Sequence, residues 1–187
     1  AGCHITMLTG GPPGKSDDME DVTDIEQKLL DRAAWYQAED DGYFRIQQTR
    51  PQTLGTGLND SPAGLLAWIT EKFYGWTDND GDLLNTVDKD KLLANISLYW
   101  FTGTINSSTR IYYEMFKTLE PGFGSTGDTP VGVSVFPYEL MMPRRRWVED
   151  SMNLVLWNEH EKGGHFASLE TPEVFVEDVR ECFRGLR

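Results

Sequence analysis

Cysteine and long hydrophobic runs are scarce in this 187-residue chain. Its two cysteines, Cys3 and Cys182, show no CxxC spacing, so the sequence indicates neither a disulfide framework nor a cysteine-bound metal. No apolar stretch is long enough to cross a bilayer, and no signal peptide is recognisable. We therefore expect a cytoplasmic protein with no membrane segment in this chain.

Basic residues are also few. There are 17 lysines and arginines against 30 acidic residues, which gives a net charge of −13. This excess of negative charge opposes binding to nucleic-acid phosphates or anionic lipids, so we expect no nucleic-acid partner. The acidic groups around Asp18 and Asp40 are expected to be solvated helix ends.

The run from Asp78 to Asp82 superficially resembles a calcium-binding loop. If Asp78 were the first ligand, the position that such a loop reserves for glycine would fall on Leu83. The spacing therefore favours a plain turn, and the sequence predicts neither a metal nor another cofactor.

The opening of the chain is strand-like and does not begin with methionine. We therefore expect the chain to be the later part of a longer protein, or a processed chain. Residues 3–8 are predicted to form the first strand, and a polar connector rich in glycine and proline follows it.

A long helical region is predicted after the connector. Apolar residues recur at helical spacing from Asp24 onward, and this pattern continues to about residue 118. One strong helix is expected to start at Pro62, with Asp60 or Ser61 as its N-cap.

Two further strands, 131–137 and 153–158, are predicted to alternate with helices after this region. The layout indicates an α/β fold with a helical insert. We divide the chain into three parts: residues 1–23, the end of one core segment; 24–118, the helical insert; and 119–187, a C-terminal α/β segment.

A histidine on a glycine turn follows the third predicted strand. The sequence Gly163-Gly164-His165 can turn sharply and present the imidazole, and Glu139 comes shortly after the second predicted strand. Ends of neighbouring strands share one rim of a sheet, so the carboxylate is placed to orient the histidine. A histidine that only hydrogen-bonds a loop is the alternative, but this arrangement favours a catalytic pair.

Two other histidines compete for the role of base. His160 lies in a charged run, where we expect a solvated turn residue, and His4 lies in the first strand, where we expect a structural role.

An ordered series of short motifs runs along most of the chain: GYFRIQ at 42–47, TRPQT at 49–53, LNDSPAGL at 58–65, EKF at 71–73, LYW at 98–100, GTI at 103–105, FPYEL at 136–140 and GGHFA at 163–167. Together they resemble the epoxide hydrolases of the microsomal type. The resemblance implies the C-terminal part of an α/β-hydrolase fold, comprising its last three strands and a helical lid inserted between the first and second of them.

The resemblance also implies roles for single residues. His165 is the expected base and Glu139 the acid that orients it, while Tyr43 and Tyr112 are the expected donors to the epoxide oxygen. Tyr113 is a neighbour that could be confused with Tyr112.

The aspartate nucleophile of this family is expected upstream of Ala1. The isolated chain is therefore predicted to be inactive, and the missing N-terminal half becomes a possible partner. The resemblance implies a small apolar epoxide and water as substrates, with no cofactor.

Two other functions remain open from the residues themselves. A serine esterase or a dehalogenase on the same fold would use Glu139 and His165 equally well, although paired lid tyrosines argue against both. A non-catalytic fragment or partner-binding module would keep the lid without the nucleophile.

Overall fold

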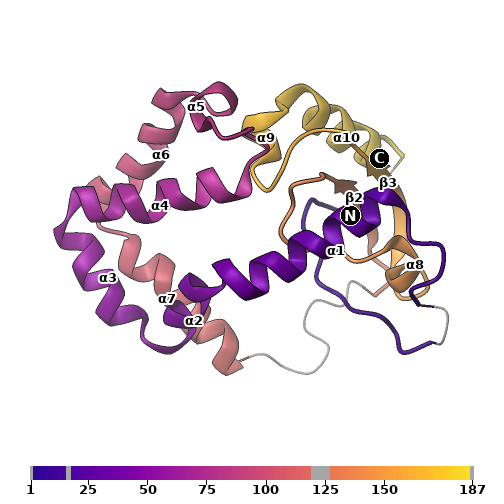
Figure 1. Ribbon diagram of the computed structural model, residues 1–187, viewed down its shortest axis with the longest axis horizontal. Coiled ribbons are helices and arrows are strands. Elements are labelled where there is room, and N and C mark those ends of the chain that lie inside the picture. The colour runs from indigo at the N-terminus through magenta and orange to yellow at the C-terminus, as the bar shows by residue number, and fades with distance from the viewer. Residues whose placement is uncertain (1, 16–17, 119–126, 186–187) are drawn as a thin grey trace.

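The computed structural model describes residues 2–15, 18–118 and 127–185. A small parallel sheet lies at one end of the molecule, and a long arch of helices extends away from it and returns (Figure 1). Three parallel strands, with a long helical region between the first and the second, are the arrangement expected from the sequence. The expected boundary near residue 119 falls in the segment 119–126, which lies outside the described residues.

The sheet has the order β1-β2-β3, formed by Cys3–Ile5, Pro130–Val135 and Asn153–Glu159. All pairs are parallel, and the ladder between β2 and β3 is interrupted by an irregularity after Val131. The predicted strands are therefore in place. The first is shorter than expected, because the chain bends at Thr6.

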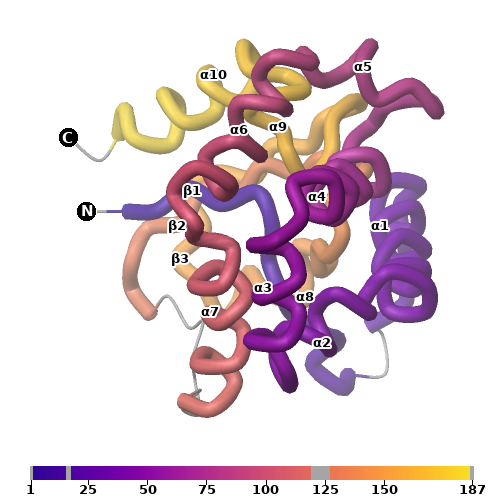
Figure 2. The backbone as a smooth tube through the Cα atoms, turned by 90° about the vertical axis from the view of Figure 1, so that its left-hand side faces the viewer, coloured from indigo at the N-terminus to yellow at the C-terminus, as the bar shows by residue number. Residues whose placement is uncertain are grey.

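The central strand β2 alternates between the two faces of the sheet. Val131, Val133 and Val135 are almost fully buried and pack with Leu29 on one face. Gly132 and Ser134 point to the other face, where helix α10 (Pro172–Arg184) contacts β2 and β3. Figure 2 shows α1 and α10 on opposite sides of this region.

The helical region begins at Asp24, as the periodicity predicted. Thr23 and Glu26 form a reciprocal capping box at the start of helix α1, Asp24–Trp35. A five-residue π-helix, η1 (Tyr36–Asp40), continues directly from α1. The helices that follow are α2 (Gly42–Thr49), α3 (Pro51–Asp60), α4 (Pro62–Trp76), α5 (Leu83–Thr86), α6 (Lys89–Thr102) and α7 (Ile105–Thr118).

Helix α4 is the strongest local prediction and is confirmed. The Ser61 hydroxyl accepts the backbone N–H of Gly64 at 3.0 Å, and Pro62 occupies the first turn. Leu65 and Phe73 are buried in a core that the arch makes among its own helices, but Leu66 is exposed.

Two interruptions divide the later helices of the arch. The segment between α4 and α6 contains only the short helix α5, and Leu83 and Val87 in this segment are buried in the core of the arch. The apolar block after Leu92 is split into α6 and α7, because Gly103 has a left-handed φ of 63° that ends α6. Among the described residues, no helix combines the length and apolarity needed to span a membrane.

Two short helices complete the C-terminal segment. Helix α8 (Arg145–Val148) falls within the helix expected between the last two strands, and α9 (Ala167–Glu170) follows the histidine turn. Buried Arg144, just before α8, ties this segment to the start of the arch. It pairs with Glu26 at 3.0 Å and donates to the backbone carbonyls of Asp18 and Asp21.

A buried polar network joins the sheet to α10. Asp178 accepts hydrogen bonds from Ser134 and Asn158, and its Oδ2 lies 2.6 Å from His160 Nε2. His4 Nε2 lies 2.8 Å from the Ser134 hydroxyl, consistent with a structural role. The expectation that His160 is a solvated turn residue is wrong, because its ring stacks on Phe136 and contacts the buried Asp178 carboxylate.

This network makes stability depend on pH. Burial alone would raise the pKa of the Asp178 carboxyl, but hydrogen bonds from Ser134, Asn158 and His160 together hold it below its usual value. The ionised Asp178 carboxylate therefore stabilises the fold fully at pH values above its unfolded-state pKa of about 4. This stabilisation is lost as the pH falls through the lower folded-state pKa. Asp178→Asn should lower the free energy of unfolding at neutral pH by about 1–3 kcal/mol and flatten its acid dependence. Denaturant unfolding between pH 3 and pH 7 measures both effects, with Glu161→Gln on the surface as control.

Candidate active site

The histidine turn is shaped by two close backbone contacts. Gly163 has φ of 105°, and a side chain at Gly164 would lie 2.5 Å from the Trp76 carbonyl oxygen. That carbonyl, at the end of α4, accepts the backbone N–H of His165 at 2.9 Å. Tyr138 also donates its N–H to the Gly163 carbonyl, so the turn is tied both to the arch and to the loop after β2.

The catalytic-pair geometry expected from the sequence is present. Glu139 is fully buried after β2, and its Oε1 lies 2.7 Å from His165 Nδ1 and also accepts the Leu140 N–H. Because the carboxylate accepts from Nδ1, the neutral imidazole keeps Nε2 as its free acceptor. The His165 side chain is 24% exposed, so the ring is held but can still be reached.

One cavity connects the histidine with both predicted tyrosines. It has a volume of about 780 Å³ and is lined by His165, Tyr43, Tyr112 and Tyr36. Most of the remaining wall is apolar and is formed by Met7, Phe44, Trp76, Ile111, Met115, Phe116, Leu140 and Met141. The structure therefore brings three of the four expected site residues to one hollow, with Glu139 behind the histidine.

The two tyrosines come from different helices of the arch. Tyr43 lies at the start of α2 and Tyr112 in α7, and their rings meet edge to face with centroids 6.0 Å apart. Burial raises the pKa of each phenol above its usual value, and hydrogen bonding to Tyr43 and Gln47 partly offsets the increase for Tyr112. Both side chains are therefore neutral donors at physiological pH. Tyr113 is not among the residues that line the cavity.

A partly buried ion pair lies beside Tyr43. Asp40 accepts hydrogen bonds from Lys72 at 2.6 Å and from the Trp76 indole N–H. The Lys72 ammonium lies 5.0 Å from the centre of the Tyr43 ring, within range of a cation–π contact. The expectation of a solvated helix end is therefore wrong for Asp40, because α4 covers its carboxylate and supplies both donors. Sequence reasoning missed this group, since Asp40 is 32 positions from Lys72 and 36 from Trp76.

A second hollow of about 460 Å³ lies against the same tyrosines. It shares Tyr43, Trp76 and Tyr112 with the first and is otherwise lined mainly by apolar groups of the arch. Trp68 and Trp76 are both in its wall.

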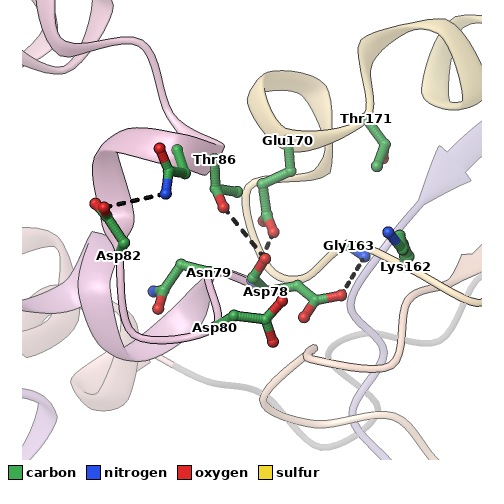
Figure 3. Close-up of a pocket in the computed structure, with 10 residues that line it drawn as sticks. Asp78, Asn79, Asp80, Asp82, Thr86, Lys162, Gly163, Glu170 and Thr171 are labelled. Atoms are coloured by element: carbon green, nitrogen blue, oxygen red, sulfur yellow. Dashed lines mark hydrogen bonds between the residues drawn. The ribbon is translucent and has the colours of Figure 1, made fainter.

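The acidic run after α4 is a turn that braces the histidine segment (Figure 3). The Asp78 carboxylate accepts the N–H of Gly163 at 3.1 Å, and Glu170 accepts the N–H groups of Asp78 and Phe166. Asp82 caps α5 through the N–H of Leu84. These carboxylates are engaged with backbone donors, so the segment is the plain turn that its spacing favoured.

This arrangement can perform acid–base chemistry on a small apolar molecule. An imidazole oriented by a carboxylate can take a proton from water, and two neutral phenols can donate to an oxygen that becomes negative. Apolar walls around these groups reduce their contact with water, which strengthens their electrostatic effect.

Comparison with known proteins gives a consistent result. A protein of Stigmatella aurantiaca assigned as an epoxide hydrolase is 49% identical over 168 residues, which cover 89% of this chain and 38% of the relative. Epoxide hydrolase 1 of Sus scrofa is 40% identical over 158 residues, which cover 78% of this chain and 34% of the relative. No protein-family model matches the chain.

The solved structures agree with the sequence relatives. The structure of the Aspergillus niger epoxide hydrolase superposes with a TM-score of 0.83 at 29% identity, covering 98% of this chain and 46% of that one. The chain thus spans less than half the length of the proteins that it matches.

The close contact at Gly164 can be tested directly. A methyl group there would collide with the Trp76 carbonyl, so Gly164→Ala should cost about 1–3 kcal/mol and displace the histidine turn. Gly57 lies in α3, where a methyl group would meet no atom within 4 Å, so Gly57→Ala is a matched control that should be neutral or slightly stabilising. Thermal unfolding of both variants measures the difference. Equal melting temperatures would contradict the role of this contact.

Proposed function

Since this chain is homologous to the C-terminal part of the epoxide hydrolases of the α/β-hydrolase fold, we propose that it carries the acid, the base and the lid donors of such an enzyme. The observation that supports this most is the single cavity lined by His165, Tyr43 and Tyr112, with Glu139 hydrogen-bonded to the histidine. Residues 24–118 would act as the lid. The proposed reaction converts an epoxide and water to a vicinal diol.

Ring opening is the first step of the proposed reaction. A carboxylate attacks an epoxide carbon, forms an ester and breaks the carbon–oxygen bond. Tyr43 and Tyr112 hydrogen-bond the epoxide oxygen, and one of them gives it a proton as the charge develops. We place the attacking aspartate in the part of the relatives that this chain does not cover, so the chain by itself should open no epoxide.

Hydrolysis of the ester is the second step. His165 Nε2 takes a proton from water, which attacks the ester carbonyl and releases the diol. Glu139 holds the imidazole in the required tautomer and stabilises the imidazolium that forms. The imidazolium then returns a proton to the tyrosine that lost one, so that the cycle closes.

The apolar wall of the cavity favours a small apolar epoxide as substrate. We also propose a reducing compartment such as the cytoplasm, because Cys3 and Cys182 are both free thiols. The esterase and dehalogenase functions are not favoured, because the relatives are epoxide hydrolases and two tyrosines face the cavity.

Removing the histidine should separate the two steps. In a complete enzyme that contains this chain, His165→Ala should reduce turnover by about 10²–10⁴-fold but still permit one round of ester formation, because attack by the carboxylate needs no base. Mass spectrometry of the protein after addition of an epoxide should show the trapped ester.

The 187-residue chain assayed alone serves as the negative control. If His165→Ala retained normal turnover, or if the protein stayed unmodified by the epoxide, His165 would not be the base. Glu139→Gln should slow hydrolysis less than His165→Ala, since the imidazole remains but is less well oriented.

The tyrosine donors are tested by removing only their hydroxyl groups. Tyr43→Phe and Tyr112→Phe should each slow ester formation by about 10²–10³-fold, and the double variant should show almost none. Rapid-mixing measurement of the single-turnover rate gives this step directly. Tyr113→Phe is the matched control on the same helix and should open the epoxide at the parental rate; parental rates for the first two variants would favour simple packing roles.

A further inference from the structure

A third tyrosine, Tyr36, lies next to Tyr43. The hydroxyl oxygens of Tyr36 and Tyr43 are 3.1 Å apart, and Tyr36 is only 5% exposed. Tyr36 also lines the cavity that contains His165 and Tyr112. The two phenols therefore share a hydrogen bond at the wall where the epoxide oxygen is proposed to bind.

The number of hydrogens decides which direction of this bond is compatible with donation from Tyr43 to a substrate. Each phenol carries one hydrogen, so Tyr43 can donate to a substrate oxygen only if Tyr36 supplies the hydrogen between the two phenols. Burial raises the pKa of Tyr36 above its usual value, so this phenol is protonated and able to donate. Donation from Tyr36 then leaves the hydrogen of Tyr43 directed at the substrate.

The π-helix η1 gives Tyr36 a fixed position. Tyr36 begins this turn and Asp40 ends it, and Asp40 is held by Lys72 and the Trp76 indole of α4. Short π-helical segments are rare and are frequently found at functional sites. The C-terminal end of η1 is thus anchored to α4, the helix whose last residue contacts the histidine turn. This anchor keeps Tyr36 at a fixed distance from Tyr43.

We propose that Tyr36 is a positioning residue for the ring-opening step: it donates a hydrogen bond to Tyr43 Oη, which orients the Tyr43 proton toward the epoxide and stabilises the phenolate left behind. The inference rests on the proposed function. In this step the epoxide carbon–oxygen bond breaks as the ester bond forms, and the alkoxide takes the proton of Tyr43. The Tyr43 phenolate keeps the hydrogen bond from Tyr36 until the imidazolium formed during hydrolysis returns a proton.

The test is a double-mutant cycle on the two half-reactions, measured in a complete enzyme that contains this chain with styrene oxide as probe. Tyr36→Phe should slow ester formation by about 10-fold, as expected for loss of a hydrogen bond to a charged group, and should leave ester hydrolysis unchanged. In a Tyr43→Phe background, Tyr36→Phe should have no further effect on ester formation, because it acts through Tyr43. Tyr74→Phe, at an exposed position of α4, is the matched control.

The outcomes separate the two proposals. If the unmodified enzyme forms no ester with the epoxide, the proposed function fails and the inference falls with it. If the enzyme forms the ester but Tyr36→Phe does so at the parental rate, or if the effects of Tyr36→Phe and Tyr43→Phe multiply, then Tyr36 is a packing residue and the inference alone is overturned. Equal slowing of both half-reactions would likewise indicate general damage to the fold and contradict it.

Discussion

The hydrogen bond from the His165 backbone to the Trp76 carbonyl is the contact on which the candidate site depends. It joins the last residue of helix α4 to the histidine turn, and it is the backbone contact between the arch and the sheet segment that lies nearest the imidazole. Glycine at position 164 is what permits this approach, since a side chain would collide with that carbonyl. Trp76 further fixes Asp40 through its indole N–H, and its ring lies 5.2 Å from those of both Tyr43 and His165. The spacing between base and phenol donors thus depends on this junction.

Carboxylates that are buried or partly buried make the other connections around the site. Glu139 holds the histidine, Asp40 holds Lys72 and Trp76, and Asp178 ties β2 to α10 through Ser134. A carboxylate removed from water is unfavourable unless hydrogen bonds compensate for its lost hydration. Each of these three carboxylates has at least two hydrogen-bonding partners. Such groups specify geometry as well as stability, because removing one partner leaves the other buried and unsatisfied.

Local sequence signals predicted much of this structure. The valine-rich strand, the Ser61 cap with Pro62, and the glycine turn before His165 depend on neighbouring residues, so they could be predicted directly. The pairing of Glu139 with His165 followed from a simple rule, that ends of adjacent strands share a rim. The role proposed for Tyr43 came only from the family resemblance, because a lone tyrosine in a predicted helix carries no signal of its own.

The features that were missed depend on distant partners. Asp40 is shielded by its partners on α4, and His160 is held by Asp178 in α10, so neither environment could be deduced from the charged runs around them. The π-helix that places Tyr36 has no local signature in the sequence. The same holds for the break between α6 and α7, which is determined by the left-handed conformation of Gly103.

The central claim is that Tyr43 and Tyr112 face one reactive oxygen in a cavity whose wall also holds His165. A crystal structure of a complete enzyme that contains this chain, bound to a small unreactive amide, would test it most directly. The account predicts the amide oxygen within hydrogen-bonding distance of both phenols, and the amide carbon in the cavity that His165 lines. An amide bound elsewhere, or one whose oxygen contacts neither tyrosine, would contradict it.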